Sequence, residues 1–408
     1  MKNNQEQDLN YGYLDEGAAY WVSVYTLPEG AHITFEGEFP YSRYMSLSSY
    51  NSADAGVIDS IKDREIQAEA GSTNPFAEGN LRNDPSRSYL ISLEPGLPPA
   101  DENSAAENIL YDGSGATDSV VLLFYRVYTP NTGRDLTGDV GLPRVTLQTE
   151  DGSIRQGEEA CSVLNAGFEP SPVYLPEDIY ANLRGDYDPS RNPPVFRTNY
   201  TVQFQVQCDF LGNCENNPER GPGLFSNADA DYIYSFLNRN NGDVLVLRGQ
   251  IPETPKTLEG NNDVFMEKEL RYWSMCEYEY YSQKLSGCLY DEQIQINEDG
   301  FYTIVTSKQE DRPDNATQDC GVGYIPWTND GDGLGVVDGR DSNPNDAWMV
   351  VRNILPASDF TQAIQNTSVS GDEPEVLGEY LPKGRYFSRA EFEGLGCNPW
   401  LALPYDQL

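Results

Sequence analysis

Short segments in which apolar and polar residues alternate run through the whole chain, and this period of two is the spacing of β-strands rather than helices. In residues 32–38 (HITFEGE), Ile33 and Phe35 share one face, whereas His32 and Glu36 share the other. Clusters of Gly, Pro, Asn and Asp separate the segments, as in β-sandwiches and barrels. The pattern predicts a mainly β fold, with further strands over residues 89–93, 120–128, 200–207, 244–248 and 302–306.

Helical patterns are few in comparison. The better candidates are residues 229–238 and residues 357–365, the second of which begins with Ser358 and Asp359. Ser and Asp are residues that accept hydrogen bonds from the free amides at a helix N-terminus. We therefore expect a small number of short helices beside the strands.

Four segments of the first half of the chain recur, in the same order, in the second half. The offset between matching residues varies from 212 to 228, as insertions in the loops between aligned strands would produce. The repeat indicates two related β domains; one large irregular β fold with similar strand chemistry is the alternative. The matching segments are residues 35–40 with 247–252, 43–47 with 271–275, 89–93 with 302–306, and 124–130 with 350–356.

The length of 408 residues also exceeds what one ordinary core accommodates. A Pro- and Asn-rich stretch at residues 186–194 is a natural junction between two domains. We expect an N-terminal arm over residues 1–18, a first β-sandwich domain over residues 19–190 and a second over residues 191–408.

Four motifs mark the second half: YWSM (272–275), DGFYTIV (299–305), YIPW (324–327) and VRNILP (351–356). With these motifs it resembles the C-terminal member of the paired bacterial envelope domains of unknown function, and RYMSL (43–47) resembles the matching strand of the N-terminal member. The whole chain resembles uncharacterised secreted actinobacterial and marine proteins, with GRYFS (384–388) near its end. The resemblance implies two jelly-roll-like β-sandwich domains, and it brings no catalytic residues.

Charge and histidine content exclude several function classes. The chain has a net charge of −38 and a single histidine, His32. Zinc sites built from several histidines and most Ser-His-Asp or Cys-His mechanisms are therefore excluded. Nucleic acids and anionic membrane surfaces require clustered basic residues, so neither is an expected partner. The longest apolar stretch, residues 120–125, is too short to span a membrane.

Seven cysteines are enough for a few disulfides on large domains. Cys208 and Cys214 frame a turn, which favours a small disulfide loop, and Cys276 and Cys288 flank another short polar segment. We expect Cys161 to remain unpaired and six cysteines to form disulfides in an oxidising compartment. The N-terminus has no apolar leader, so either a leader is missing or the protein is cytosolic with reduced thiols; we expect an extracellular or periplasmic protein. The disulfide cysteines are Cys208, Cys214, Cys276, Cys288, Cys320 and Cys397.

An acidic, glycine-rich loop at residues 329–346 is the strongest metal candidate. Ca²⁺ takes six to eight oxygen ligands from a loop that can bend around it. The spacing departs from the EF-hand pattern, and a solvated acidic loop is the alternative. A weaker candidate, residues 227–231, is explained equally well by capping of free backbone amides. The sequence thus predicts calcium at Asp330, Asp332, Asp338 and Asp341.

Arginines beside aromatic residues recur at matching positions in the two halves. They could line a ligand-binding cleft between the domains, or they could form structural ion pairs. Aromatic residues on strands can stack on sugars or pack within a sandwich. The predicted ligand-binding residues are Arg43, Tyr44, Arg271, Tyr272 and Trp273.

These features favour a secreted, acidic protein that binds a glycan, a small apolar molecule or a protein partner, with calcium as a structural cofactor. One alternative is an extracellular filament or matrix subunit that self-associates through its N-terminal arm. Another is a carboxylate- or metal-dependent hydrolase acting in a cleft between the domains. The sequence contains no Gly-x-Ser-x-Gly motif and no glycine loop that would hold phosphate, so an enzyme is the less favoured hypothesis.

Overall fold

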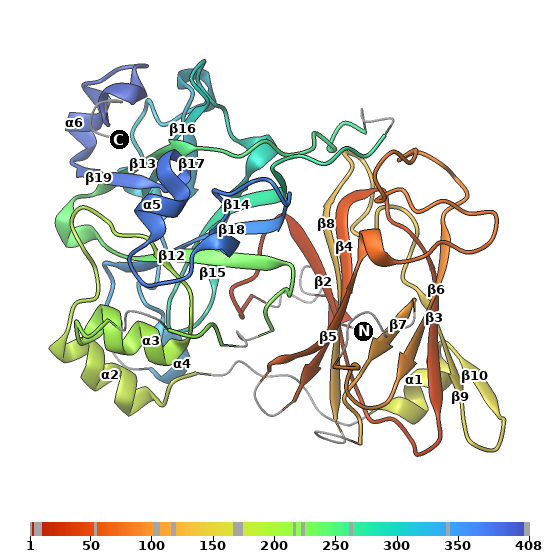
Figure 1. Cartoon of the computed structure of the whole chain (residues 1–408). Coiled ribbons are helices and arrows are strands. Elements are labelled where there is room, and N and C mark those ends of the chain that lie inside the picture. The colour runs from red at the N-terminus through yellow and green to blue at the C-terminus, as the bar shows by residue number, and fades with distance from the viewer. Residues whose placement is uncertain are drawn as a thin grey trace.

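The computed structural model describes residues 2–3, 10–52, 55–100, 107–115, 120–165, 174–214, 218–221, 225–260, 264–339 and 343–403. Within these residues the chain forms four β-sheets and several short helices, which confirms the mainly β fold. Figure 1 shows the red-to-yellow strands of the first half on one side of the molecule and the green-to-blue strands of the second half on the other.

Strands β1 to β10 form the first sandwich. Its sheets have the strand orders β1-β2-β8-β4-β5 and β10-β9-β3-β6-β7. Apolar residues of the facing sides, including Trp21, Phe35, Leu47 and Tyr125, fill the space between the sheets. The strands are β1 (Lys2–Asn3), β2 (Ala18–Tyr25), β3 (His32–Glu38), β4 (Ser42–Asn51), β5 (Val57–Lys62), β6 (Ser88–Glu94), β7 (Ile109–Tyr111), β8 (Val121–Pro130), β9 (Arg144–Gln148) and β10 (Ile154–Gln156).

Strands β11 to β19 form the second sandwich. Its sheets have the orders β11-β12-β18-β14-β15 and β17-β16-β13-β19, and Leu247, Trp273, Tyr302 and Met349 lie between them. The strands are β11 (Arg197–Thr198), β12 (Ala230–Asn238), β13 (Val244–Gln250), β14 (Leu270–Tyr278), β15 (Leu285–Tyr290), β16 (Phe301–Ser307), β17 (Gly323–Pro326), β18 (Asp346–Pro356) and β19 (Lys383–Phe387).

The two sandwiches repeat one topology. Strands β2, β8, β4 and β5 correspond to β12, β18, β14 and β15, and strands β9, β3, β6 and β7 correspond to β19, β13, β16 and β17. In both sandwiches the pair at the far edge, β6 with β7 or β16 with β17, runs parallel. The recurring segments lie on corresponding strands, so the prediction of two related β-sandwiches is confirmed. The domain boundaries at residues 18 and 190 stay predictions.

Backbone strain recurs in the same places. A positive φ is unfavourable for residues other than glycine and persists only where the surroundings impose it. Three pairs of such residues are separated by the offsets of the recurring segments, which indicates that the turns were duplicated with the strands. The pairs are Tyr13 (φ 54°) with Phe225 (φ 49°), Ala55 (φ 57°) with Gln283 (φ 62°), and Thr129 (φ 43°) with Leu355 (φ 47°).

A glycine opposite a tyrosine explains one recurring motif. Gly37 on β3 pairs with Tyr89 on β6, and Gly249 on β13 pairs with Tyr302 on β16. A Cβ atom on Gly37 or Gly249 would lie 2.6 or 2.9 Å from the facing tyrosine oxygen. Both strands therefore need glycine where the tyrosine ring crosses the neighbouring backbone.

The helices are short and few, as expected. Helices α1 to α5 lie in connections between strands and α6 follows the last strand; α2 and α3 are at the lower edge of the second half in Figure 1. They are α1 (Glu158–Leu164), α2 (Glu177–Asp186), α3 (Val202–Gln205), α4 (Leu334–Asp338), α5 (Glu373–Leu377) and α6 (Arg389–Glu393).

Two helix predictions were wrong. Residues 230–238 form strand β12, because alternate residues face two apolar surroundings: Ile233 faces the second core, and Tyr234 packs on the outer face. Residues 357–365 form turns and the start of a 3-10 turn, Ile364–Asn366. Of the acidic residues that suggested helix caps, Asp229 and Asp359 lie in turns and Asp231 lies on β12.

One strand prediction was also wrong. The strand was predicted over residues 200–207, but residues 202–205 form helix α3, which is followed by a π-helical turn, Val206–Phe210. The Thr201 side chain caps the helix by accepting a hydrogen bond from the Phe204 amide at 3.0 Å. Local capping thus prevails over the alternating pattern, which is too short to determine the conformation.

The cysteine predictions were confirmed. Three disulfides join Cys208 to Cys214, Cys276 to Cys288 and Cys320 to Cys397. Cys161 is free and exposed.

The disulfide Cys276–Cys288 has a counterpart in the first sandwich. Cys276 on β14 faces Cys288 on β15, and at the matching register Ser48 on β4 faces Ser60 on β5. The two serine hydroxyls are hydrogen-bonded at 2.9 Å. The same cross-strand pair is therefore joined by a disulfide in the second sandwich and by a hydrogen bond in the first.

Replacing both Cys276 and Cys288 with serine is expected to leave the fold intact and to lower the free energy of unfolding by about 3 kcal/mol, the value for closing a short loop. The serines can form the hydrogen bond that Ser48 and Ser60 form. The double alanine variant is the control and should lose about 1 kcal/mol more. Urea unfolding measures both, and a serine variant no more stable than the alanine variant would contradict the correspondence.

Candidate functional site

The outer faces of sheets β2-β8-β4 and β12-β18-β14 pack against each other and join the two sandwiches. The contact is largely aromatic: the Tyr128 ring lies 5.1 Å from the Tyr272 ring and 5.4 Å from the Tyr44 ring, both edge-on. Edge-on packing at these distances is favourable beyond simple burial. The two halves thus share one buried interface.

Two buried ion pairs are exchanged across this interface. Arg43 on β4 binds Asp291, with Nη1–Oδ distances of 2.5 and 2.6 Å, and also contacts Glu292. Arg271 on β14 binds Asp63, with an Nη1–Oδ2 distance of 2.9 Å. Each aspartate begins a 3-10 turn after the edge strand of its own sandwich, β15 or β5. Each sandwich therefore supplies an arginine to the other and receives one, as in a twofold-symmetric dimer.

The two aspartates have matching backbone partners. Asp63 Oδ2 accepts the Met45 amide at 3.2 Å, and Asp291 Oδ2 accepts the Trp273 amide at 3.0 Å. Burial raises the pKa of Asp63 to about 6, although the Arg271 charge and the Met45 amide act in the opposite direction. Each carboxylate thus accepts a backbone hydrogen bond within its own sandwich and forms an ion pair with an arginine of the other.

All five residues predicted to bind a ligand are buried at or beside this interface. Arg43 and Arg271 form the ion pairs, and Trp273 lies in the second core. The Tyr44 hydroxyl donates to Asn227 Oδ1 at 3.1 Å, and the Tyr272 hydroxyl donates to Asp15 Oδ1 at 2.8 Å. Their placement favours the structural alternative; contact with a ligand stays an untested prediction.

A short segment before β2 and another before β12 each cross to the opposite sandwich. Arg352 Nη2 donates to the Tyr13 carbonyl at 2.5 Å, and the Tyr278 hydroxyl donates to the Leu14 carbonyl at 2.8 Å. At the matching positions Arg126 Nη2 donates to the Phe225 carbonyl and the Tyr50 hydroxyl to the Ser226 carbonyl, both at 2.7 Å. We call residues 13–15 and 225–227 the crossing segments. Residues 13–15 of the predicted arm therefore lie on the second sandwich of the same chain.

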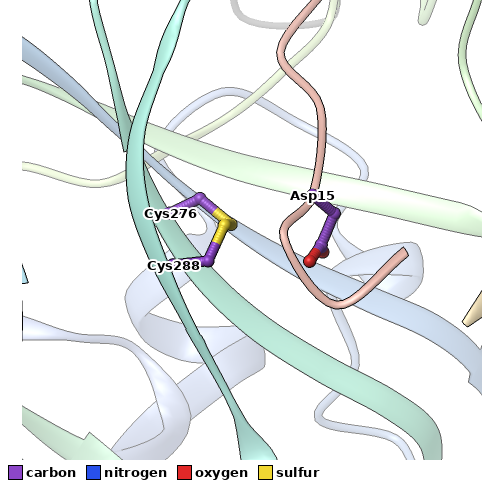
Figure 2. A group of neighbouring side chains, drawn as sticks. All are labelled: Asp15, Cys276 and Cys288. Carbon is purple, nitrogen blue, oxygen red and sulfur yellow. A yellow bond between two sulfur atoms is a disulfide. The ribbon is translucent and has the colours of Figure 1, made fainter. Parts of the chain in front are cut away.

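Asp15 ends the first crossing segment and lies beside the disulfide Cys276–Cys288, as Figure 2 shows. Because the sulfurs are bonded to each other, they are not thiolate ligands, so the group is not a metal site in this state. The Asp15 oxygens accept hydrogen bonds from Tyr272, from Ser274 Oγ at 2.6 Å and from the Gly17 amide at 2.8 Å. Arg352 Nη1 lies 3.4 Å away and supplies the opposite charge.

A cavity of about 950 Å³ lies where β2 and β8 approach β12 and β18, and it extends to residues of the first core such as Ile33, Phe35 and Leu123. The crossing segments form part of its wall. Two buried arginines, Arg126 and Arg352, line it, and Glu158 is the sole carboxylate among the described residues of the wall. The wall is otherwise mainly apolar and aromatic, with rings from Tyr13, Tyr20, Phe124, Phe225, Tyr232 and Trp348.

The structure describes the side chains of two of the four predicted calcium ligands, Asp330 and Asp332. Asp330 is exposed, whereas Asp332 is buried. The Asp332 oxygens accept hydrogen bonds from the Tyr180 hydroxyl, the Leu334 amide, and the amide and side chain of Asn343, at 2.6 to 3.2 Å. These hydrogen bonds tie Asp332 to its own loop and to α2, and calcium there stays an untested prediction. The side chain of Asp338, the last residue of α4, and the whole of Asp341 lie outside the described residues.

No protein-family model matches the chain, and no curated protein matches it. Among solved structures, it is similar to an uncharacterized protein from Burkholderia cenocepacia, with 12% identity, a TM-score of 0.47 and coverage of 94% of this chain and 79% of that one. It is also similar to the VPA0106 protein from Vibrio parahaemolyticus, with 11% identity, a TM-score of 0.42 and coverage of 94% and 93%. At these scores the likeness carries no argument about function, and the resemblance to envelope domains stays a prediction.

The part of the chain that the structure describes has no helix that is both long and apolar enough to cross a membrane.

Proposed function

We propose that this protein binds a small, mainly apolar ligand in the cavity between its two sandwiches. The supporting observation is the cavity itself: ligand sites are typically clefts of about 300–1,000 Å³ with apolar and aromatic walls and a few polar groups. A volume of about 950 Å³ with rings on both sides and two buried arginines fits that description. The ligand would lie between the two duplicated sheets.

The other hypotheses find less support. A hydrolase that uses two carboxylates needs both in one pocket, and Glu158 stands alone in the described wall. A filament subunit would use its N-terminal arm on a neighbour, but residues 13–15 contact the chain's own second sandwich. Three disulfides favour an extracellular or periplasmic site of action.

An uncharged fluorescent probe tests the proposal. N-phenyl-1-naphthylamine is expected to gain fluorescence with saturable binding of one molecule per chain. Val22 on β2 is half-buried and lines the cavity, so Val22→Trp should fill part of it and weaken binding about tenfold or more. Leu90→Trp, on the solvent side of β6, is the matched control and should leave binding unchanged.

The single free thiol provides a second measurement. Cys161 is exposed and lines the cavity, so a bound probe should slow its alkylation. Equal probe affinity of wild type and Val22→Trp, together with unchanged alkylation, would contradict binding in this cavity.

A further inference from the structure

The duplicated interface differs in charge at the ends of the two crossing segments, residues 15 and 227. Residue 15 ends the first crossing segment and residue 227 ends the second, and their side-chain oxygens accept equivalent hydrogen bonds. Asp15 accepts from Tyr272 and from the amide two residues later. Asn227 accepts from the amide of Asp229 at 3.1 Å and from Tyr44 at 3.1 Å, and the Tyr44 hydroxyl also lies 2.5 Å from Asp229 Oδ2. The carboxylate of one half is thus an uncharged amide in the other.

This difference leaves one of two matching arginines without a counter-ion. Arg352 has Asp15 at 3.4 Å, and its other donors reach Cys276, Tyr13 and Tyr278. Arg126, the matching residue on β8, donates to Ser48 Oγ at 3.3 Å and to the Phe225 carbonyl. No carboxylate among the described residues pairs with it, although it is 1% exposed.

Two donors next to the cavity are also unused. Arg126 Nε and Asn227 Nδ2 are buried and have no hydrogen-bond partner among the described residues, and both residues line the cavity. The Asn227 oxygen accepts the backbone amide of Asp229, which can only donate, and this fixes the Asn227 nitrogen as the free end. A buried donor that lacks an acceptor costs about 1–3 kcal/mol, and more if it is charged. An acceptor in the cavity would give such a donor a partner.

Aromatic rings compensate the Arg126 charge only in part. The guanidinium lies 5.0 Å from the Phe124 ring centre and 5.4 Å from that of Tyr50. Such cation–π contacts contribute about 0.5–2 kcal/mol, which is less than the cost of burying an unpaired charge. An anion beside Arg126 would supply what Asp15 supplies to Arg352.

We infer that the cavity takes an amphipathic carboxylate, whose carboxylate binds Arg126 and Asn227 and whose apolar body lies between the aromatic walls. The inference rests on the proposed function and adds the chemical class of the ligand. The carboxylate would occupy at Arg126 the place that the Asp15 carboxylate has at Arg352. A ligand with a single carboxylate fits, because Arg352 already pairs with Asp15.

Calorimetry with a matched pair of ligands tests the inference. The probes are 4-phenylbutyrate and its uncharged analogue 4-phenylbutan-1-ol, measured at pH 7.5 in 0.15 M NaCl, where the long-range repulsion from the net charge of −38 is screened beyond about 8 Å. Wild type is expected to bind the acid about tenfold or more tightly than the alcohol, since a charged hydrogen bond contributes about 1.5–3 kcal/mol.

The decisive variant is Asn227→Asp, which places a carboxylate beside Arg126 as Asp15 stands beside Arg352. It should abolish the preference for the acid and keep the affinity for the alcohol. Arg126→Gln should do the same, and a melting curve confirms that each variant is folded. Equal wild-type affinities, or a preference that survives in Asn227→Asp, would overturn the carboxylate site but not the proposed function. Failure of the acid, the alcohol and N-phenyl-1-naphthylamine to bind would contradict both.

Discussion

Replacing Arg43 with methionine is expected to lower the free energy of unfolding by about 3–5 kcal/mol, the usual cost of removing one member of a buried ion pair. Methionine keeps much of the apolar stem, so the loss is mainly electrostatic. Asp291 and Glu292 would remain next to each other with side chains 1% and 10% exposed and without their cation. The Thr257 hydroxyl, which accepts from Arg43 Nε at 3.0 Å, would lose that donor as well.

The matched control is Arg144→Met. Arg144 on β9 also pairs with a glutamate on a neighbouring strand, Glu36, but the two side chains are 54% and 49% exposed. Exposed pairs contribute about 0–1 kcal/mol, so this variant should be close to wild type. Urea unfolding at pH 7 compares the two variants. If Arg43→Met costs no more than Arg144→Met, the exchanged pairs do not hold the sandwiches together.

The exchanged ion pairs, the crossing segments and the shared positive-φ turns indicate one origin for the interface. In a twofold-symmetric dimer, each contact appears twice with the roles of the subunits reversed. Here Arg43 with Asp291 and Arg271 with Asp63 are such a pair of contacts within one chain. We infer that the chain is a tandem duplication that retains the contacts of a symmetric dimer. Joined in one chain, the two copies can diverge, and Asp15 and Asn227 have done so.

Much of the fold followed from local sequence. Strand alternation and the recurring segments predicted the sandwiches, because inward-facing residues such as Phe35 and Leu247 are constrained by burial. The errors at residues 202–207 and 230–238 arose where the pattern was short or both faces were apolar. In β12 the faces contact two different cores, so periodicity alone could not separate strand from helix.

The site was less predictable. Arg43 and Arg271 stood out in the sequence, but their partners Asp63 and Asp291 did not, although the same offset of 228 residues separates both pairs. A search for acids at that offset would have found them. The cavity depends on how two sheets pack, and no local pattern records that. Asn227 stands out among the residues of the cavity wall only when it is compared with Asp15, the matching residue of the first half.

A second large effect on stability is expected at Glu277, a residue of β14 whose side chain is completely buried. Burial raises its pKa from 4.5 to about 8, while hydrogen bonds from Thr306 and the Thr328 amide act in the opposite direction. The folded protein therefore keeps this proton between about pH 4.5 and pH 8, whereas the unfolded chain releases it. The free energy of unfolding falls across this range, by at most about 1.4 kcal/mol per pH unit.

Glu277→Gln is expected to remove this fall, because glutamine does not titrate and has the shape of the protonated acid. Its oxygen can accept from the Thr328 amide, and its nitrogen can donate to Thr306 Oγ1. The variant should match wild type near pH 4 and be more stable by about 4 kcal/mol near pH 8, the value that the shift in pKa implies.

Urea unfolding from pH 4 to pH 8 measures the difference, with the exposed Glu298→Gln as the control, expected to change stability by about 0.5 kcal/mol at most at every pH. Other buried acids, such as Asp346 with a pKa raised to about 6 by burial, affect wild type and variant alike and cancel in the comparison. If Glu277→Gln loses stability with pH as steeply as wild type does, Glu277 is ionised in the folded protein. Its nearest opposing charge, Arg239, would then outweigh the cost of burial.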